Sequence, residues 1–159
     1  MRIVVFSDSH GSYNAAESVI LRNEDADMFV HLGDGECDVS TLSKNYPLID
    51  IRSVSGNCDF RGYFHLINII DTEYARIFCT HGHRHRVKTE LEELINAARQ
   101  SDCNIVLYGH THQRHTEYSN GIYFMNPGSC VEPRDGKPPS YGSIDLSEAG
   151  IAMSIVDLL

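Results

Sequence analysis

The sequence lacks several of the signatures that usually identify a site. No Cys-x-x-Cys pair occurs among its five cysteines, which argues against a zinc ribbon or a thioredoxin-like site and favours free thiols in a reducing compartment. No G-x-G-x-x-G segment is present, which excludes a dinucleotide-binding fingerprint. No Ser/His/Asp arrangement suggests a side-chain nucleophile.

Positive charge and long apolar runs are also scarce. The 13 lysines and arginines are outnumbered by 22 aspartates and glutamates, giving a formal net charge of −9, so the basic footprint of a nucleic-acid-binding protein is missing. No apolar run is long enough to span a bilayer, and we expect no signal peptide, no membrane partner and a cytoplasmic protein. Because the 159 residues contain no repeat, low-complexity segment or long linker, we predict one domain over residues 1–159.

Short apolar runs alternate with segments of helical spacing. Strands are predicted at 2–7, 28–32, 49–55, 105–108, 141–146 and 151–156. Helices are predicted at 13–22 and 87–100. Hairpins are predicted for 64–70 with 74–80 and, across Asn120-Gly121, for 116–119 with 122–125. The front is βα-like and the back mostly β, which predicts an α/β (α+β) fold of two packed sheets flanked by helices.

Seven potential metal ligands follow these apolar runs. In chain order they are Asp8, His10, Asp34, Asn57, His81, His110 and His112. Most stand just after the carboxyl end of a predicted strand, which is the edge of an α/β sheet where ligands bind. In Asp8-Ser-His10 and His110-Thr-His112 the two side chains would share one face of an extended segment. Carboxylates, an amide and imidazoles together suit two divalent transition metals.

Each segment has a simpler interpretation when it is taken alone. Asp8 and His10 could cap the helix predicted at 13–22, and Gly33-Asp34-Gly35 could be a turn. This turn is not an EF-hand loop, because valine and asparagine occupy the positions that require glycine and glutamate. The histidine pair at 110 and 112 is harder to explain outside a metal site, and the segments together favour metal binding over coincidence.

The same segments resemble those of the calcineurin-like metallophosphoesterase superfamily, and in size its small YfcE-type phosphodiesterase branch. The matching blocks are Asp8-Ser-His10, Gly33-Asp34, Gly56-Asn-Cys-Asp59, Thr80-His-Gly-His83, Gly109-His-Thr-His112 and Asn126-Pro-Gly-Ser129. One block alone would be weak evidence, but their order and spacing are specific. The resemblance implies a metallo-dependent phosphatase-like fold, a four-layer β-sandwich of two mixed sheets flanked by helices.

The resemblance also implies a ligand set for two metal ions. The first ion would be held by Asp8, His10, Asp34 and His112. Asp34 would bridge to a second ion, completed by Asn57, His81 and His110. A carboxylate has two oxygens with which to bridge, whereas a neutral imidazole offers one free nitrogen. We expect Mn²⁺ first, and Fe, Co, Ni or Zn are compatible with the same ligands.

The chemistry implied is hydrolysis of a small phosphodiester substrate. Two metals about 3.5–4 Å apart activate a bridging water, and the resulting hydroxide attacks phosphorus in line while Asn57 helps to absorb the developing charge. Cys58 stands where many superfamily members have a histidine credited with protonating the leaving group. A thiol could donate this proton but bonds more weakly than imidazolium, so diesters with good leaving groups should suffer least.

Other polar residues in these segments have open roles. His83 is a candidate to line the mouth of the site and contact substrate phosphate, or it is a solvated loop histidine. Asp59 could serve the catalytic machinery by orienting the Cys58 loop, or could cap a turn. Arg134 could meet a substrate phosphate or face solvent. The segment Asn126–Ser129 is a turn that the resemblance places as a support of the metal site.

Burial can be predicted for several residues without a role. We expect Glu36 and Asp38 to be surface acids and His31 to be packed within its strand. The cysteines other than Cys58 are interpreted as small buried hydrophobic residues.

Other function classes remain open. A relative of this fold serves as the retromer scaffold subunit and has lost some metal-site histidines, whereas the four histidines of the implied ligand set are all present here, which favours catalysis. A phosphomonoesterase is a second alternative, separable by the ratio of diester to monoester turnover. A DNA-repair nuclease would need a nucleic-acid-binding addition and a more favourable charge, so nucleic acid is not expected as a partner. A homo-oligomer is compatible with the sequence but not determined by it.

Overall fold

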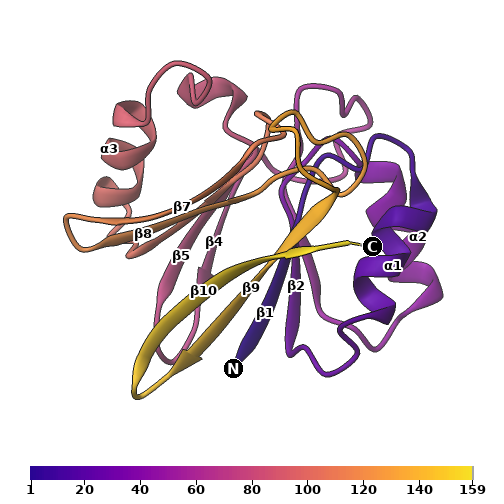
Figure 1. Cartoon of the computed structure of the whole chain (residues 1–159), viewed down its shortest axis with the longest axis horizontal. Helices are drawn as coiled ribbons and strands as arrows, with labels where there is room; N and C mark the ends of the chain where they lie inside the picture. Colours follow the sequence, from indigo (N-terminus) through magenta and orange to yellow (C-terminus); the bar gives the residue numbers. More distant parts are fainter. Residues whose placement is uncertain (159) are drawn as a thin grey trace.

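Two mixed β-sheets form the centre of the fold (Figure 1). The computed structural model describes residues 1–158. The first sheet, ordered β10-β9-β1-β2-β3, contains β1 (Arg2–Phe6), β2 (Met28–His31), β3 (Ile51–Ser53), β9 (Ser140–Ser147) and β10 (Gly150–Asp157). Its neighbours β1, β2 and β3 run parallel, whereas β9 is antiparallel to both β1 and β10.

The second sheet repeats this mixture of directions. Ordered β4-β5-β6-β8-β7, it contains β4 (Ile67–Asp71), β5 (Arg76–Thr80), β6 (Ile105–Tyr108), β7 (Arg114–Ser119) and β8 (Ile122–Pro127). The neighbours β5, β6 and β8 are parallel, and β4 and β7 are antiparallel edge strands. The hairpin predicted at Asn120-Gly121 is confirmed, and both residues have the positive φ that its tight turn requires.

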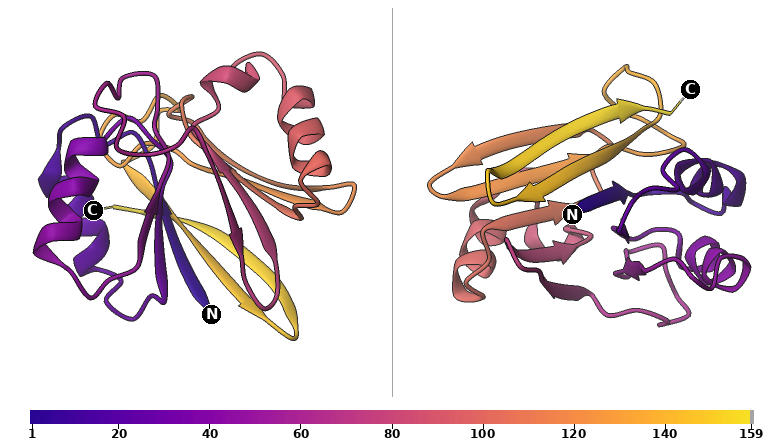
Figure 2. Two further views of the ribbon diagram at one scale, coloured as in Figure 1. Left: turned by 180° about the vertical axis from the view of Figure 1, so that it is seen from behind. Right: turned by 90° about the horizontal axis from the view of Figure 1, so that it is seen from below.

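Helices cover the outer faces of the sheets. They are α1 (Tyr13–Leu21), α2 (Glu36–Asn45) and α3 (Glu92–Gln100), with a 3₁₀-helix η1 (His83–His85) before α3. Figure 2 shows α1 and α2 together on one side of the molecule and α3 on the other. The four-layer sandwich of two mixed sheets flanked by helices is therefore confirmed. Within residues 1–158, none of the helices combines the length and the apolar character needed to cross a bilayer.

Alternation along the strands separates three hydrophobic layers. In β1, Ile3 and Val5 face the second sheet, where they join Ile77 and Leu107 in the central core. The intervening residues of β1 point the other way and pack under α1 and α2. That outer cluster includes Val4, Phe6, Val19, Ile20 and Leu42. A third cluster seats Leu94 and Ala98 of α3 on the second sheet. Burial on both faces explains why β1, β2 and β6 are continuous apolar runs.

One predicted helix starts later than expected, and one helix was missed. The helix predicted at 87–100 begins at Glu92, because Arg86 adopts a left-handed conformation (φ 53°) and Val87 packs under Gly82 as part of a turn. The helix α2 was not predicted at all. Its ten residues carry few apolar side chains, although Val39 and Leu42 are fully buried at helical spacing.

Candidate metal centre

The predicted ligands gather in loops at one end of the sandwich, at the upper edge of the sheets in Figure 1. Asp8 and Asp34 follow the parallel strands β1 and β2, while His81 and His110 follow β5 and β6 of the other sheet. Backbone bonds tie the loops together: the Asp8 N–H donates to the Gly33 carbonyl at 3.0 Å and the His10 N–H donates to that of Asp34 at 2.8 Å. Because β1 runs parallel to β2, and β5 parallel to β6, the loops at their carboxyl ends meet at one edge of each sheet and together form one site.

Five of these residues have left-handed backbone conformations. The φ angles are 56° at Asp8, 46° at His10, 57° at Asp34, 69° at His110 and 56° at His112. The expectation of extended Asp-x-His and His-x-His segments was therefore wrong. Such conformations cost on the order of 1–3 kcal/mol each and persist where the surroundings impose them, as at functional sites.

Asp8 presents one carboxylate oxygen to the centre of the site. Its Oδ2 accepts the Ser7 hydroxyl at 2.6 Å and the His110 N–H at 3.2 Å. Its Oδ1 is buried without a hydrogen-bond partner among residues 1–158 and lies 3.1 Å from His112 Nε2. The side chain is fully buried. A buried, fixed carboxylate oxygen without a donor is what a metal ligand requires before its ion arrives.

The two carboxylate oxygens of Asp34 also have different surroundings. Its Oδ1 accepts the Cys58 N–H at 2.7 Å, which fixes the carboxylate. Its Oδ2 lies 3.3 Å from His81 Nε2 and 3.9 Å from His10 Nε2. Because these two histidines approach from opposite sheets, Asp34 Oδ2 lies between the two ligand groups that the sequence suggested.

Two histidines are fixed in the tautomer that leaves Nε2 free. The Nδ1 of His81 lies 2.7 Å from the Leu32 carbonyl oxygen, and the Nδ1 of His112 lies 2.7 Å from that of Glu132. A carbonyl can only accept, so Nδ1 carries the proton and Nε2 faces the carboxylates. This backbone support is the usual arrangement behind a metal-binding histidine.

The remaining predicted ligands lie at the periphery of this cluster. Asn57 Oδ1 is 3.2 Å from His81 Nε2, and the His110 ring meets the His81 ring edge-on with centroids 5.0 Å apart. In the part of the chain that the structure describes, ligand atoms within 4.8 Å of one another come from three groups. These are Asp8 with His10 and His112, Asp8 with Asp34 and His81, and His10 with Asp34 and Cys58. His110 belongs to none of these three groups.

Burial and the carboxylates of Asp8 and Asp34 shift the pKa values of the clustered side chains. Burial opposes the charged form of His81 and of His112, but the neighbouring carboxylates of Asp34 and Asp8, respectively, raise both pKa values above normal. Burial and the charge of His81 lower the pKa of His110 to about 4. Although burial opposes it, hydrogen bonding to His81 and the charge of that ring lower the pKa of Asp34. The acids and His110 are thus ready to bind cations at neutral pH.

The Asp59 carboxylate supports the loop that carries Asp34. It accepts four backbone N–H groups, from Asp34, Gly35, Glu36 and Gly56, at 2.8–3.0 Å. The side chain therefore faces the backbone of the loop. This contact pattern fits orientation of the site rather than contact with substrate.

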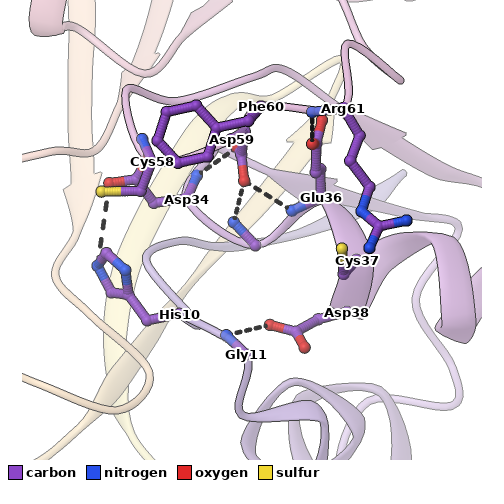
Figure 3. Close-up of a pocket in the computed structure, with 11 residues that line it drawn as sticks. His10, Gly11, Asp34, Glu36, Cys37, Asp38, Cys58, Asp59, Phe60 and Arg61 are labelled. Atoms are coloured by element: carbon purple, nitrogen blue, oxygen red, sulfur yellow. Dashed lines mark hydrogen bonds and ion pairs between the residues drawn. The ribbon is translucent and has the colours of Figure 1, made fainter.

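Cys58 and His83 border different cavities next to the candidate ligands. The Cys58 thiol borders a cavity with His10 and Asp34 (Figure 3). Burial and the charge of Asp34 raise the pKa of this thiol to about 11, so it stays protonated. His83 borders two other cavities, and its ring centroid lies 5.5 Å from that of His81. Arg134 is exposed, and its N–H donates to the His112 carbonyl at 2.9 Å.

The burial of several residues differs from the prediction. Glu36 and Asp38 are not surface acids: both are almost fully buried, because each accepts N–H or O–H groups of the surrounding loops. Cys37 is exposed, against expectation, whereas the three cysteines later than Cys58 are buried as predicted. His31 is packed as predicted.

The segment Asn126–Ser129 is not the predicted turn, because Asn126 and Pro127 end β8 and a loop follows, but it supports the site as the resemblance suggested. The Asn126 amide donates to the Gly109 carbonyl at 2.9 Å, and the Ser129 hydroxyl donates to the Asp8 carbonyl at 2.9 Å. Both residues are fully buried. They join the end of β8 to the two ligand loops.

This donor set fits divalent metal ions. The unpartnered Asp8 Oδ1, the shared Asp34 Oδ2 and the free Nε2 atoms converge from four separate loops. Hard oxygen and borderline nitrogen ligands in this combination suit transition metals.

Comparison with known proteins gives consistent results. A model of the calcineurin-like phosphoesterase superfamily domain matches residues 1–149. The probable metallophosphoesterase YsnB of Bacillus subtilis is 30% identical, covering 99% of this chain and 91% of that protein. The phosphodiesterase YfcE of Escherichia coli is 31% identical, covering 91% and 88%.

Solved structures extend the comparison. A protein from Streptococcus pneumoniae described as a predicted phosphoesterase superposes with a TM-score of 0.88 at 29% identity, covering 99% of this chain and 89% of that one. Vps29 of Entamoeba histolytica superposes with a TM-score of 0.73 at 22% identity, covering 99% of each chain. The latter likeness shows the fold alone.

Proposed function

The chain belongs to the calcineurin-like phosphoesterase superfamily, and on that premise we propose that it is a phosphodiesterase that works with two divalent metal ions. The observation that carries the proposal is the convergence of two fixed carboxylate oxygens, Asp8 Oδ1 and Asp34 Oδ2, on the Nε2 atoms of three histidines. Phosphodiesterase YfcE and phosphodiesterase MJ0936 of Methanocaldococcus jannaschii are relatives over most of the chain, which supports the choice of diester.

The chain's own residues have separate tasks in this proposal. The first metal would be held by Asp8, His10, Asp34 and His112. The second would be held by Asp34, Asn57, His81 and His110. When bound, the metals supply an activated water and positive charge for the phosphoryl oxygens, and Mn²⁺ is our first choice. The exposed Asn57 amide can donate to a phosphoryl oxygen, and His83 stands at the opening where a second oxygen would lie.

Cys58 is proposed as the group nearest the leaving oxygen. Its thiol is protonated at neutral pH, but a pKa of about 11 makes it a weak acid. A weak acid assists poor leaving groups least, so diesters with acidic leaving groups are the favoured substrates.

The test is hydrolysis of a chromogenic phosphodiester by protein stripped of metal with a chelator. We expect turnover to require added Mn²⁺ and to exceed turnover of the matching monoester. Elemental analysis of the reconstituted protein should give two metal ions per chain. A single bound ion with full activity would contradict the two-metal proposal, and faster turnover of the monoester would favour a phosphomonoesterase.

A binding scaffold is the second candidate, because the Vps29 fold superposes over nearly the whole chain. One of these neighbours is Vps29 in complex with zinc, so bound metal alone does not separate the two functions. Absence of turnover on any phosphoester by protein with two bound metals would favour the scaffold.

A further inference from the structure

A cavity of about 340 Å³ opens directly beside the metal ligands (Figure 3). It is lined by His10, Asp34 and Cys58, by the first turn of α2, and by the segment Phe60-Arg61. Its volume falls at the lower end of the range of about 300–1,000 Å³ that small-molecule sites occupy. A substrate held at the metal ligands would therefore place one of its substituents here.

The acidic residues that border this cavity are already engaged by the protein. Asp38 accepts the Ser9 hydroxyl at 2.6 Å and the Gly11 N–H at 3.0 Å. Asp59 accepts the four loop N–H groups described above. The buried carboxylate of Glu36 accepts the N–H groups of Arg61 and Tyr63. These carboxylates form part of the cavity wall, and because they already accept hydrogen bonds from the protein they do not indicate a further cation site in the cavity.

Phe60 and Arg61 are the groups that remain free for a ligand. The Phe60 ring is 89% exposed and lies next to Cys58 and Asp34 in Figure 3. Arg61 is also exposed, and its guanidinium makes one side-chain hydrogen bond within residues 1–158, at 3.4 Å to the Tyr63 hydroxyl. Figure 3 shows its side chain running past Glu36 towards Cys37.

The backbone of this segment is fixed although its side chains are exposed. The Glu36 carboxylate accepts the backbone N–H groups of Arg61 and Tyr63. Asp59, the residue before Phe60, accepts the N–H of Asp34 and so ties the start of the segment to the Asp34 loop. An exposed aromatic ring on a fixed backbone loses little further freedom when a ligand stacks on it.

We propose that this cavity binds a planar aromatic substituent of the substrate, stacked on Phe60 with Arg61 directed at its acceptor atoms. The inference rests on the proposed function and narrows its substrate to phosphodiesters that carry a nucleobase or a base-like ring. Stacking on an aromatic side chain tolerates any base, because every base has a π-face. The Arg61 guanidinium adds donors that suit ring nitrogens and carbonyls.

The test compares two ligands that share a phosphate and a pentose. The Kd of AMP and of ribose 5-phosphate is measured by calorimetry on Mn²⁺-loaded protein. We expect AMP to bind at least about 10-fold more tightly, as base stacking predicts. Phe60→Ala should reduce this preference to within about 2-fold, whereas Phe60→Tyr should keep it. Tyr118→Ala, which alters an exposed ring on β7, is the matched control.

Hydrolysis of bis(p-nitrophenyl) phosphate, measured in parallel, separates this inference from the proposed function. Equal Kd values, undetectable binding of both ligands, or a preference that survives Phe60→Ala would overturn the subsite, whether or not the diester is hydrolysed. A preference for AMP that depends on Phe60, in protein without diesterase activity, would support the subsite and contradict the proposed function.

Discussion

Asp59 accepts the backbone N–H of Asp34 at 2.8 Å, so a carboxylate 25 residues away in sequence fixes the residue that lies between the two ligand groups. The same carboxylate takes three more N–H groups of the adjoining loops. An acceptor of four donors has no simple replacement, because a carboxamide offers one oxygen.

Asp59→Asn should therefore destabilise the protein. Its NH₂ group would face N–H donors, and each donor left unsatisfied costs about 1–3 kcal/mol, so we expect a loss of roughly 2–4 kcal/mol in the free energy of unfolding. Urea denaturation of metal-free protein measures it. Asp71→Asn, at an exposed carboxylate paired with Arg76, should change stability by less than about 0.5 kcal/mol. Equal stability of both variants would show that Asp59 does not hold the loop.

Asp34→Ala should remove metal as well as turnover. If Asp34 Oδ2 is shared, the variant loses a ligand from each ion, and turnover should fall by more than the roughly 10–100-fold loss seen when only the supporting partner of a ligand is removed. Elemental analysis after dialysis against Mn²⁺ measures the content. Asp25→Ala, at an exposed aspartate, serves as the control. Normal metal content in Asp34→Ala would contradict the bridging role.

Cys58→His should raise activity on monoesters. An imidazolium donates a proton more readily than a thiol with a pKa of about 11, and general acid catalysis contributes about 10²–10⁴-fold where the leaving group is poor. We expect the ratio of monoester to diester turnover to rise by about tenfold or more, measured as kcat/KM on paired p-nitrophenyl and alkyl substrates. Cys58→Ser, which supplies no such acid, should give no rise. An unchanged ratio in Cys58→His would show that Cys58 only fills space.

His31 should make the stability of the metal-free protein depend on pH. Burial lowers its pKa to about 4, and the Gly33 N–H donates to its Nδ1 at 3.3 Å, so the folded protein holds a neutral ring. The unfolded chain binds the proton near pH 6.5, so stability is lost as pH falls from 6.5 towards 4. At about 1.4 kcal/mol for each factor of ten in proton affinity, the loss is roughly 3 kcal/mol.

Urea denaturation at several pH values between 4 and 7 measures this loss. The variant His31→Gln has no proton to bind, so its stability should decline less over the same range than that of the unsubstituted protein. Parallel profiles for the two proteins would show that His31 does not carry the effect.

Local chemistry accounts for much of what the sequence revealed. The strands β1, β2 and β6 were recognisable because burial on both faces requires continuous apolar runs, and Asn120-Gly121 was recognisable because its turn needs two positive φ angles. The candidate ligands could be named because carboxylates and imidazoles stand at strand ends in a specific order. Each of these signals lies within a few residues of the feature it predicts.

Other features depended on residues distant in the chain. Helix α2 was missed because its few apolar side chains make a weak periodic signal. Its buried face is made by Val39 and by Leu42, which packs in the cluster with Val4 and Phe6 of β1. Glu36 was taken for a surface acid because its partners, the N–H groups of Arg61 and Tyr63, lie about 25 residues further on. Sequence spacing gives no measure of such contacts.

By itself, the sequence determined which side chains could hold metal ions and the kind of fold that would present them. The tertiary structure decided how those side chains are oriented: which oxygen of Asp8 is left free, which nitrogen of His81 faces inward, and where the cavity beside Phe60 opens. The physical reason is that hydrogen-bond partners select one lone pair or one tautomer, and here those partners come from other loops and from the opposite sheet.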